Sequence, residues 1–288
     1  MKTVLSTLTL GLIALMLAPP ASAQPADIKK LEAEVATLQG QVTTLQGQVA
    51  ALQTTINSAN AKNAFALGQF VTVDTTDTLN GLAAPHIIFT GANLHVRDGS
   101  GATDDGGGAT TGLGNLVIGY DEAPSSPPAA YRSGSHDLVV GPHHTFSSFG
   151  GFVAGDTNAV EGPSATVTGG RVNAATGVWS SVSGGLGNSA ADEATSISGG
   201  HGNTAIQFGS SVSGGDNNTA NGATASVSGG SFNHATGSSA SISGGESNVA
   251  SDIDATVSGG RLNQATASDA AVGGGDGLIN STANTFVP

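Results

Sequence analysis

The chain has 288 residues, a formal net charge of −13, no cysteine, and 44 glycines against 4% aromatic residues. The acidic balance disfavours nucleic acid and anionic membrane surfaces as partners, because both favour basic patches on a protein. Without cysteine there are no disulfide bonds to stabilise an exported fold. So few large side chains also disfavour a conventional globular core of this length.

Residues 1–23 are predicted to be an export signal. Lys2 supplies a positive start, residues 4–17 are largely apolar, and Ala21-Ser22-Ala23 matches the small-x-small cleavage pattern. The apolar run is too short for a permanent transmembrane helix. We therefore expect a mature chain that begins at Gln24 and has no integral membrane segment. Its expected location is extracellular or at the cell surface, with the periplasm as the alternative.

Residues 24–60 are predicted to form an α-helical coiled coil. Ile or Val at every a position and Leu at every d position make one narrow stripe, called here the seam: Ile28, Leu31, Val35, Leu38, Val42, Leu45, Val49, Leu52 and Ile56. A helix that packs on its own domain shows a wider apolar face, so we expect a homo-oligomer. The choice of a and d residues favours two strands, whereas the repeats downstream favour three. A trimer is the preferred prediction and a dimer the alternative.

Residues 61–150 are expected to form a β-rich connector that ends in irregular cap coils. Segments 115–119 and 137–141 are similar apolar runs that end in glycine and predict two strands. A Pro- and Ser-rich insertion at 123–134 separates them. Residues 98–114, rich in glycine and aspartate, are predicted to be a loop.

Residues 151–280 are predicted to form a β-roll of stacked 15-residue coils. Eight Gly-Gly pairs recur at this spacing, from Gly169-Gly170 to Gly274-Gly275, and a fixed period of this kind indicates one small unit stacked on itself. Each pair can supply the positive φ that a sharp corner needs. The predicted fold class is therefore mainly β, a parallel β-roll or β-solenoid that follows an N-terminal coiled coil. Residues 281–288 are expected to be a C-terminal tail.

The coil before the first glycine pair is interpreted as a divergent copy of the repeat. Phe152 lies fifteen residues before Val167, and Asn158 lies fifteen before Asn173. Irregular terminal coils are typical of the caps that close repeat arrays. The solenoid is thus expected to begin before the strict period does.

Two residue columns are predicted to build the inside of the roll. A β-branched residue flanked by Ser or Thr recurs as an inward core ladder, with hydroxyls outward: Val167, Val182, Ile197, Val212, Val227, Ile242, Val257 and Val272. An asparagine ladder, three residues after each second glycine, is predicted to hydrogen-bond along the stack: Asn173, Asn188, Asn203, Asn218, Asn233, Asn248 and Asn263. One Val or Ile and one Ala per coil bury little apolar area, so association of several rolls is expected.

The repeat units, such as ASVSGGSFNHATG at residues 225–237, resemble the head repeats of YadA-like trimeric autotransporter adhesins. The resemblance covers about residues 152–278. It implies a trimer of left-handed parallel β-rolls joined to a coiled-coil stalk. Two features depart from the family pattern: the stalk precedes the head, and the family's C-terminal membrane β-barrel is not expected after the last repeat. Self-export and outer-membrane anchoring are therefore not expected to carry over.

Candidate chemical sites are few. The densest group of potential metal ligands follows no recognised ligand spacing, and its members are expected in a solvated loop: His136, Asp137, His143 and His144. The carboxylate pairs Asp104-Asp105 and Asp121-Glu122 are likewise expected in solvated turns. No catalytic residue, cofactor or metal ion is predicted.

These observations favour a non-enzymatic, exported surface or extracellular protein. Its repeat head would serve as a multivalent structural or adhesion module for an unidentified surface, matrix or glycan ligand. One alternative is a carbohydrate-active or carbohydrate-binding β-helix protein, such as a lyase or depolymerase. The other is a binder of a flat, repetitive surface through the Ser/Thr ladder.

Overall fold

The computed structural model describes residues 25–124 and 129–288, apart from the side chains of 59–66, 129 and 130. The predicted export signal lies outside the described residues. The chain divides after Leu94 into two compact units. None of the helices in the described ranges has the length and apolar character needed to cross a membrane.

The first unit contains one long helix and one hairpin. Helix α2 (Pro25–Gly68) includes the whole predicted seam and extends past the predicted boundary at residue 60. The sequence after the last seam position explains the extension, because it is rich in alanine, the strongest helix former. Strand β1 (Val71–Asp74) then pairs antiparallel with β2 (His86–Phe89).

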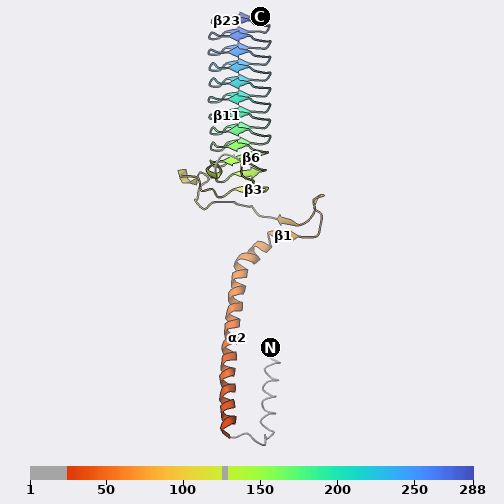
Figure 1. Cartoon of the computed structure of the whole chain (residues 1–288), viewed down its shortest axis with the longest axis vertical. Helices are drawn as coiled ribbons and strands as arrows, with labels where there is room; N and C mark the ends of the chain where they lie inside the picture. The colour runs from red at the N-terminus through yellow and green to blue at the C-terminus, as the bar shows by residue number, and fades with distance from the viewer. Residues whose placement is uncertain (1–24, 125–128) are drawn as a thin grey trace. The chain divides into compact units, whose positions relative to one another are not determined.

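The second unit is a parallel β-solenoid, in which each coil adds one short strand to each of two sheets (Figure 1). The first sheet has 12 strands: β3 (Leu116–Ile118), β4 (Leu138–Val140), β6 (Phe152–Ala154), β8 (Thr166–Val167), β10 (Ser181–Val182), β12 (Ser196–Ile197), β14 (Ser211–Val212), β16 (Ser226–Val227), β18 (Ser241–Ile242), β20 (Thr256–Val257), β22 (Ala271–Val272) and β24 (Phe286–Val287).

The second sheet has ten strands: β5 (Thr145–Phe146), β7 (Ala159–Val160), β9 (Ala174–Ala175), β11 (Ser189–Ala190), β13 (Thr204–Ala205), β15 (Thr219–Ala220), β17 (His234–Ala235), β19 (Val249–Ala250), β21 (Gln264–Ala265) and β23 (Ile279–Asn280). Two 3-10 turns, η1 (Asp105–Gly107) and η2 (Ala129–Arg132), lie in the cap below the regular coils. Each strand thus pairs with the equivalent strand of the next coil, and no α-helix connects the parallel strands in the described residues.

The strands contribute two ladders to the interior of the regular coils, and a further buried column of small residues runs from Ala165 to Ala270. Val167 pairs with Val182 in the first sheet, and Ala175 pairs with Ala190 in the second, which is the 15-residue register. The eight predicted core-ladder residues all have exposed fractions of 0 or 1%. Alternation along each strand sends the flanking residues outward, so each strand contributes one side chain to the core.

The divergent coil has a different register from the predicted one. Phe152 pairs with Thr166, and Val153 pairs with Val167, so the prediction that Phe152 lies one period before Val167 is wrong. The strand-to-strand spacing here is 14 residues because the corner after β6 contains one glycine, Gly155, instead of a pair. After that corner the stack returns to 15 residues, since Asn158 lies directly below Asn173.

The roll continues to the end of the chain, where a tail was expected. Strand β24 pairs with β22, so residues 281–288 form part of a last coil. Asn280 pairs with Ala265 and occupies the inward alanine position of that coil. Its Nδ2 donates to the carbonyl oxygens of Ala271 and Thr285 at 3.0 and 2.8 Å. A satisfied amide thus replaces the methyl group where the core ends.

Candidate functional site

The seam side chains of α2 are exposed in the single chain. Their exposed fractions run from 41% at Ile28 to 62% at Leu52, and only Val35 is half-buried. A continuous stripe of exposed aliphatic side chains on a helix indicates a surface that another element covers. The described residues of the first unit do not cover it.

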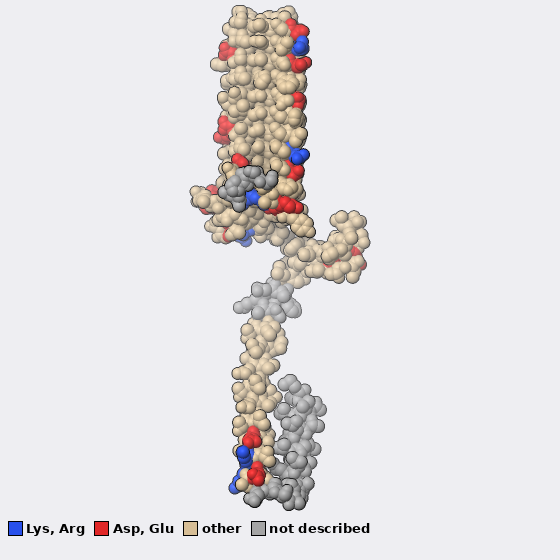
Figure 2. All heavy atoms as spheres, viewed as in Figure 1, with Lys and Arg blue, Asp and Glu red and all other residues tan. Residues whose placement is uncertain are grey.

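One outward face of the roll has constant chemistry. In seven consecutive coils the core-ladder residue is flanked on both sides by Ser or Thr, from Thr166 and Thr168 to Thr256 and Ser258. We call this surface the serine face. The first hydroxyl of each coil is half-buried and the second is exposed. Figure 2 shows acidic and basic side chains along the edges of the roll, with uncharged surface between them.

The outward face of the second sheet has varied chemistry. Its matching column contains small, polar, imidazole and aliphatic side chains: Ala174, Ser189, Thr204, Thr219, His234, Val249, Gln264 and Ile279. The pairing and the 15-residue register are the same on both faces. The backbone geometry therefore tolerates many outward residues, and the constancy of the serine face needs another cause.

The two glycines of each corner also differ. The second glycine of each pair has a φ between +77° and +102°, and in Gly170 to Gly260 an added Cβ would overlap the glycine carbonyl oxygen of the next coil. The first glycine has no positive φ, and from Gly199 to Gly274 nothing lies within 4 Å of an added Cβ. The second glycine is thus required by the stack, whereas no contact within the chain requires the first.

The asparagine ladder satisfies the interior of these corners. From Asn158 to Asn248, the Oδ1 of each asparagine accepts the backbone N–H of the asparagine one coil later, at 2.7–3.0 Å. Asn263 Oδ1 accepts the N–H of Leu278 in the same way. Each Nδ2 donates to glycine carbonyl oxygens, as Asn218 does to Gly214 and Gly230. The stacking partner is therefore the backbone amide in every copy, with side-chain amides as additional partners in three of them.

His144 continues this ladder into the cap, where a solvated loop was expected. Its side chain is fully buried, its Nδ1 accepts the backbone N–H of Asn158 at 3.2 Å, and its Nε2 lies 3.1 Å from the carbonyl oxygen of Val140. These partners are equivalent to those of an asparagine, so the neutral imidazole with a hydrogen on Nε2 replaces the amide. Only alignment with Asn158, 14 residues on, could have revealed this role.

The other members of the predicted histidine group lie apart. His143 Nδ1 contacts Asp156 Oδ1 at 3.0 Å on the surface. Asp137 is 5% exposed, and its Oδ1 accepts the backbone N–H of Gly151 at 2.7 Å, while its Oδ2 is buried without a partner. Burial raises the pKa of Asp137 to about 6, because a carboxylate loses hydration there. The solvated-loop prediction is thus wrong for Asp137 as well.

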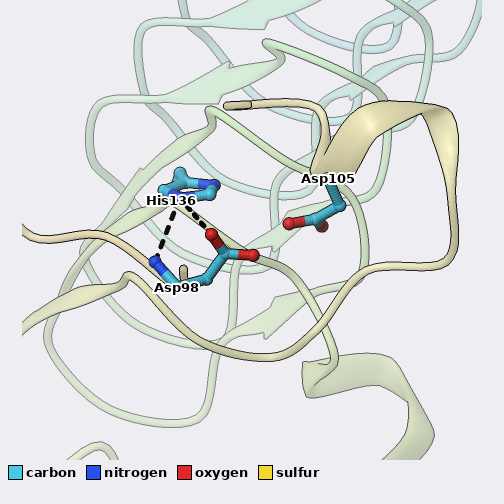
Figure 3. A group of neighbouring side chains, drawn as sticks. All are labelled: Asp98, Asp105 and His136. Carbon is cyan, nitrogen blue, oxygen red and sulfur yellow. Dashed lines mark hydrogen bonds and ion pairs between the residues drawn. The ribbon is translucent and has the colours of Figure 1, made fainter. Parts of the chain in front are cut away.

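His136 belongs to a different cluster, formed with Asp98 and Asp105 (Figure 3). The three residues come from the loop, the turn η1 and the start of the coil that contains β4. His136 Nε2 lies 3.3 Å from Asp98 Oδ1 and 3.4 Å from the backbone nitrogen of Asp98. Figure 3 shows the Asp105 carboxylate directed toward the other two side chains. The described residues contain no other His/Asp/Glu group of this kind.

The cluster is shielded and hydrogen-bonded from outside. The Asp98 side chain is 2% exposed, and it lies near the surface of the cap, covered by a loop. Backbone and side-chain donors of Ser100 contact Asp98 Oδ1 at 2.8 Å, and the backbone donation holds the pKa of Asp98 well below its usual range. Asp105 Oδ2 accepts from the Ser135 hydroxyl and from the backbone N–H of Thr111. Asp105 is therefore not in a solvated turn.

The remaining carboxylates of the cap have structural contacts. Asp104 stays exposed and accepts the N–H of Gly106 at 3.1 Å, which caps η1. Asp121 is half-buried and forms an ion pair with Arg132, whose guanidinium lies 5.6 Å from the ring centre of Phe146. Asp121 thus departs from the predicted solvated turn, because Arg132, at the end of η2, contacts both its side chain and its carbonyl oxygen.

Comparisons with known proteins assign no family. No protein-family model matches the chain, and no curated protein or solved structure matches it either. The resemblance to YadA-like heads therefore depends on the repeat sequence, with which a parallel solenoid of 15-residue coils is compatible.

Proposed function

We propose that this protein is a non-enzymatic, exported surface or extracellular protein. Its N-terminal helix would assemble the chain into an oligomer, preferably a trimer, and its roll would act as a multivalent structural or adhesion head. The ligand class would be an extracellular matrix, surface or glycan. The observation that carries the proposal is the exposed seam of α2, since a lone chain leaves it in water.

The seam supports self-association because of its length and its residues. In a parallel bundle of identical helices, Val or Ile at a and Leu at d pack into the holes between side chains of the facing helix. Leu45 and Val49 are each nearly 60% exposed in the single chain. Their burial in a bundle would stabilise it by about 1.5–3 kcal/mol for each fully covered side chain.

The roll supports contact between copies through the serine face. A surface that lies against another backbone favours small side chains, and glycine at a position without strain indicates close approach from outside. The serine face has small side chains, and the first glycines lie at positions without strain. The face of the second sheet shows no such constancy. We therefore place the contact between rolls on the serine face, which leaves the varied face for solvent or ligand.

The test is the mass of the mature chain in solution. Light scattering on a sizing column of residues 24–288 is expected to give three chains per particle. Leu45→Lys puts a charge into the seam and is expected to yield a monomer, while Ala51→Lys, at a heptad c position outside the seam, should leave the trimer intact. A monomeric wild-type protein overturns the proposal, and a dimer removes the trimeric analogy.

Attachment is tested with the same variants. A panel of matrix proteins and glycans on a sensor surface should retain the wild-type oligomer. If attachment is multivalent, the Leu45→Lys monomer should bind about 100-fold more weakly, because it loses avidity and keeps each single contact. Equal binding by monomer and oligomer contradicts a multivalent head, and turnover of a polysaccharide would favour the carbohydrate-active alternative.

A further inference from the structure

We propose that Asp98, Asp105 and His136 bind one divalent transition-metal ion of the zinc class, which fastens the loop at 98–107 to the base of the roll. This site is independent of the proposed attachment function. It belongs to one chain and to one unit of it, so it needs no second copy.

The first argument is the hydrogen-bonding state of His136. Its Nδ1 lies 3.1 Å from the carbonyl oxygen of Thr103, which can only accept, so Nδ1 carries the hydrogen. Its Nε2 then has a lone pair, which accepts the N–H of Asp98 at 3.4 Å. A metal-ligating histidine has the same arrangement, since it donates one ring N–H to a backbone carbonyl and coordinates through the lone pair of the other nitrogen. Metal binding here would replace the long contact between Nε2 and the N–H of Asp98.

The second argument is the meeting of acceptors at one point. Asp98 Oδ1 lies 3.3 Å from the Nε2 lone pair, and Asp105 Oδ1 is buried without a hydrogen-bond partner. The ligand atoms of all three residues lie within 4.8 Å of one another. Asp98 Oδ1 and His136 Nε2 already accept hydrogen bonds from Ser100 and from the N–H of Asp98, whereas Asp105 Oδ1 has no donor. A metal ion satisfies all three at once.

The third argument is charge. Two carboxylates share this shielded place, and none of the Lys or Arg ion pairs among the described residues includes either of them. A buried anion needs a compensating cation or a proton. One divalent cation coordinated by both carboxylates would balance their two charges.

The surrounding contacts orient the two carboxylates. Thr111 Oγ1 donates to Asp98 Oδ2 at 3.0 Å, and the Ser135 hydroxyl donates to Asp105 Oδ2. The Oδ1 atoms are thus held toward His136, and outer-shell contacts of this kind tune metal affinity. Gly114 completes the site, because an added Cβ would lie 2.7 Å from Cδ2 of His136.

The donor set selects the class of metal. One imidazole nitrogen and two carboxylate oxygens suit Zn²⁺ and its neighbours in the first transition row. Calcium and magnesium prefer sites made of oxygen alone. With three protein ligands, a tetrahedral ion would keep its fourth position for water. Because its ligands come from the loop and from the base of the roll, the proposed role of the ion is structural.

The experiment uses the whole mature chain after removal of metal with a chelator. Titration with Zn²⁺ against a chromogenic competitor should show one tight ion per chain, and Co²⁺ should give a visible d–d spectrum that Zn²⁺ displaces. Asp105→Asn should weaken Zn²⁺ binding about 100-fold, and Ser135→Ala about 10-fold. His201→Asn, which removes an exposed histidine 2.6 Å from Asp216, should change nothing.

Two outcomes decide the matter. Unchanged circular dichroism of the metal-free variants establishes that any loss of binding comes from the site. Co²⁺ spectra of the wild type show whether the folded protein binds a metal ion, without any variant. If the folded wild type binds no Zn²⁺ at stoichiometric concentrations, or if Asp105→Asn binds as tightly as wild type, the site is not a metal site and the cluster is held by shared protons.

Discussion

The two glycines of each corner stand side by side, yet different forces fix them. The second has a positive φ and lies against the carbonyl oxygen of the next coil, so the stack of one chain demands it. The first has ordinary φ and free space around it, although it recurs just as strictly. The same contrast separates the serine face from the varied face. The proposed contact between rolls accounts for this constancy, which the contacts of the single chain do not require.

The largest expected effect comes from substituting alanine at the two glycines of one corner. Gly215→Ala places a Cβ against Gly230 and 2.6 Å from Asn218 Nδ2, at a φ of +92°. Strain and overlap together should lower the free energy of unfolding by more than about 3 kcal/mol. Gly214→Ala should leave the isolated roll unchanged, or stabilise it by up to about 1 kcal/mol. Urea unfolding in the Leu45→Lys background measures both.

In the proposed trimer, substitution of the first glycine should be destabilising, although it is tolerated in the isolated roll. In the wild-type background, Gly214→Ala is expected to reduce the fraction of trimer on a sizing column, because a methyl group would enter the contact between rolls. Its matched control is Asn221→Ala on the varied face. If Gly214→Ala destabilises the monomer as much as Gly215→Ala, the contrast between the two columns disappears.

The next effect concerns the asparagine ladder. Asn218→Ala removes the acceptor of the Asn233 N–H and the donor to the carbonyl oxygens of Gly214 and Gly230. Leaving these buried groups without partners should cost about 3 kcal/mol of unfolding free energy. Asn221→Ala, three residues on and half-buried on the varied face, should cost less than about 0.5 kcal/mol. Equal losses at both sites would contradict a structural ladder.

The periodic part of this fold could be predicted because repetition multiplies a weak signal. A single Ser-Val-Ser triplet predicts little, but the core ladder from Val167 to Val272 keeps one spacing, and the strands keep the same one. The asparagine column was predictable in position for the same reason. Its main hydrogen-bond partner, a backbone amide, was not, since side-chain periodicity says nothing of backbone donors.

The cap could not be predicted because each of its contacts occurs once. Asp98 and His136 meet across 38 residues, a distance that no motif spans, and His144 replaces asparagine with a different residue type. The shift of Phe152 follows from the loss of one glycine, which a search at fixed period cannot detect. The extension of the helix to Gly68 depends on helix propensity, whereas the prediction followed the heptad stripe.

The last expected effect is a gain in stability that depends on pH, and it comes from a residue of the cap. Asp137 occupies a buried position above Asn115 and below Gly151, and the pKa of its carboxyl is raised from 3.8 to about 6. A folded-state pKa above the unfolded value means that the stabilising contribution is present below about pH 4 and is lost as the pH rises through 6. At pH 7.5 the ionised side chain therefore destabilises the fold.

Asp137→Asn should remove that penalty, because a neutral amide can still accept the N–H of Gly151 while its nitrogen offers a donor where Oδ2 has no partner. The variant should gain up to about 3 kcal/mol at pH 7.5, from about two pKa units at 1.36 kcal/mol each, and nothing at pH 4. Urea midpoints at both pH values measure this difference, with Asp254→Asn at an exposed corner as the control. A loss of stability at pH 7.5 would instead mean that the charge of Asp137 stabilises the cap, and that this buried carboxylate, like the second glycines, is required by contacts within the chain.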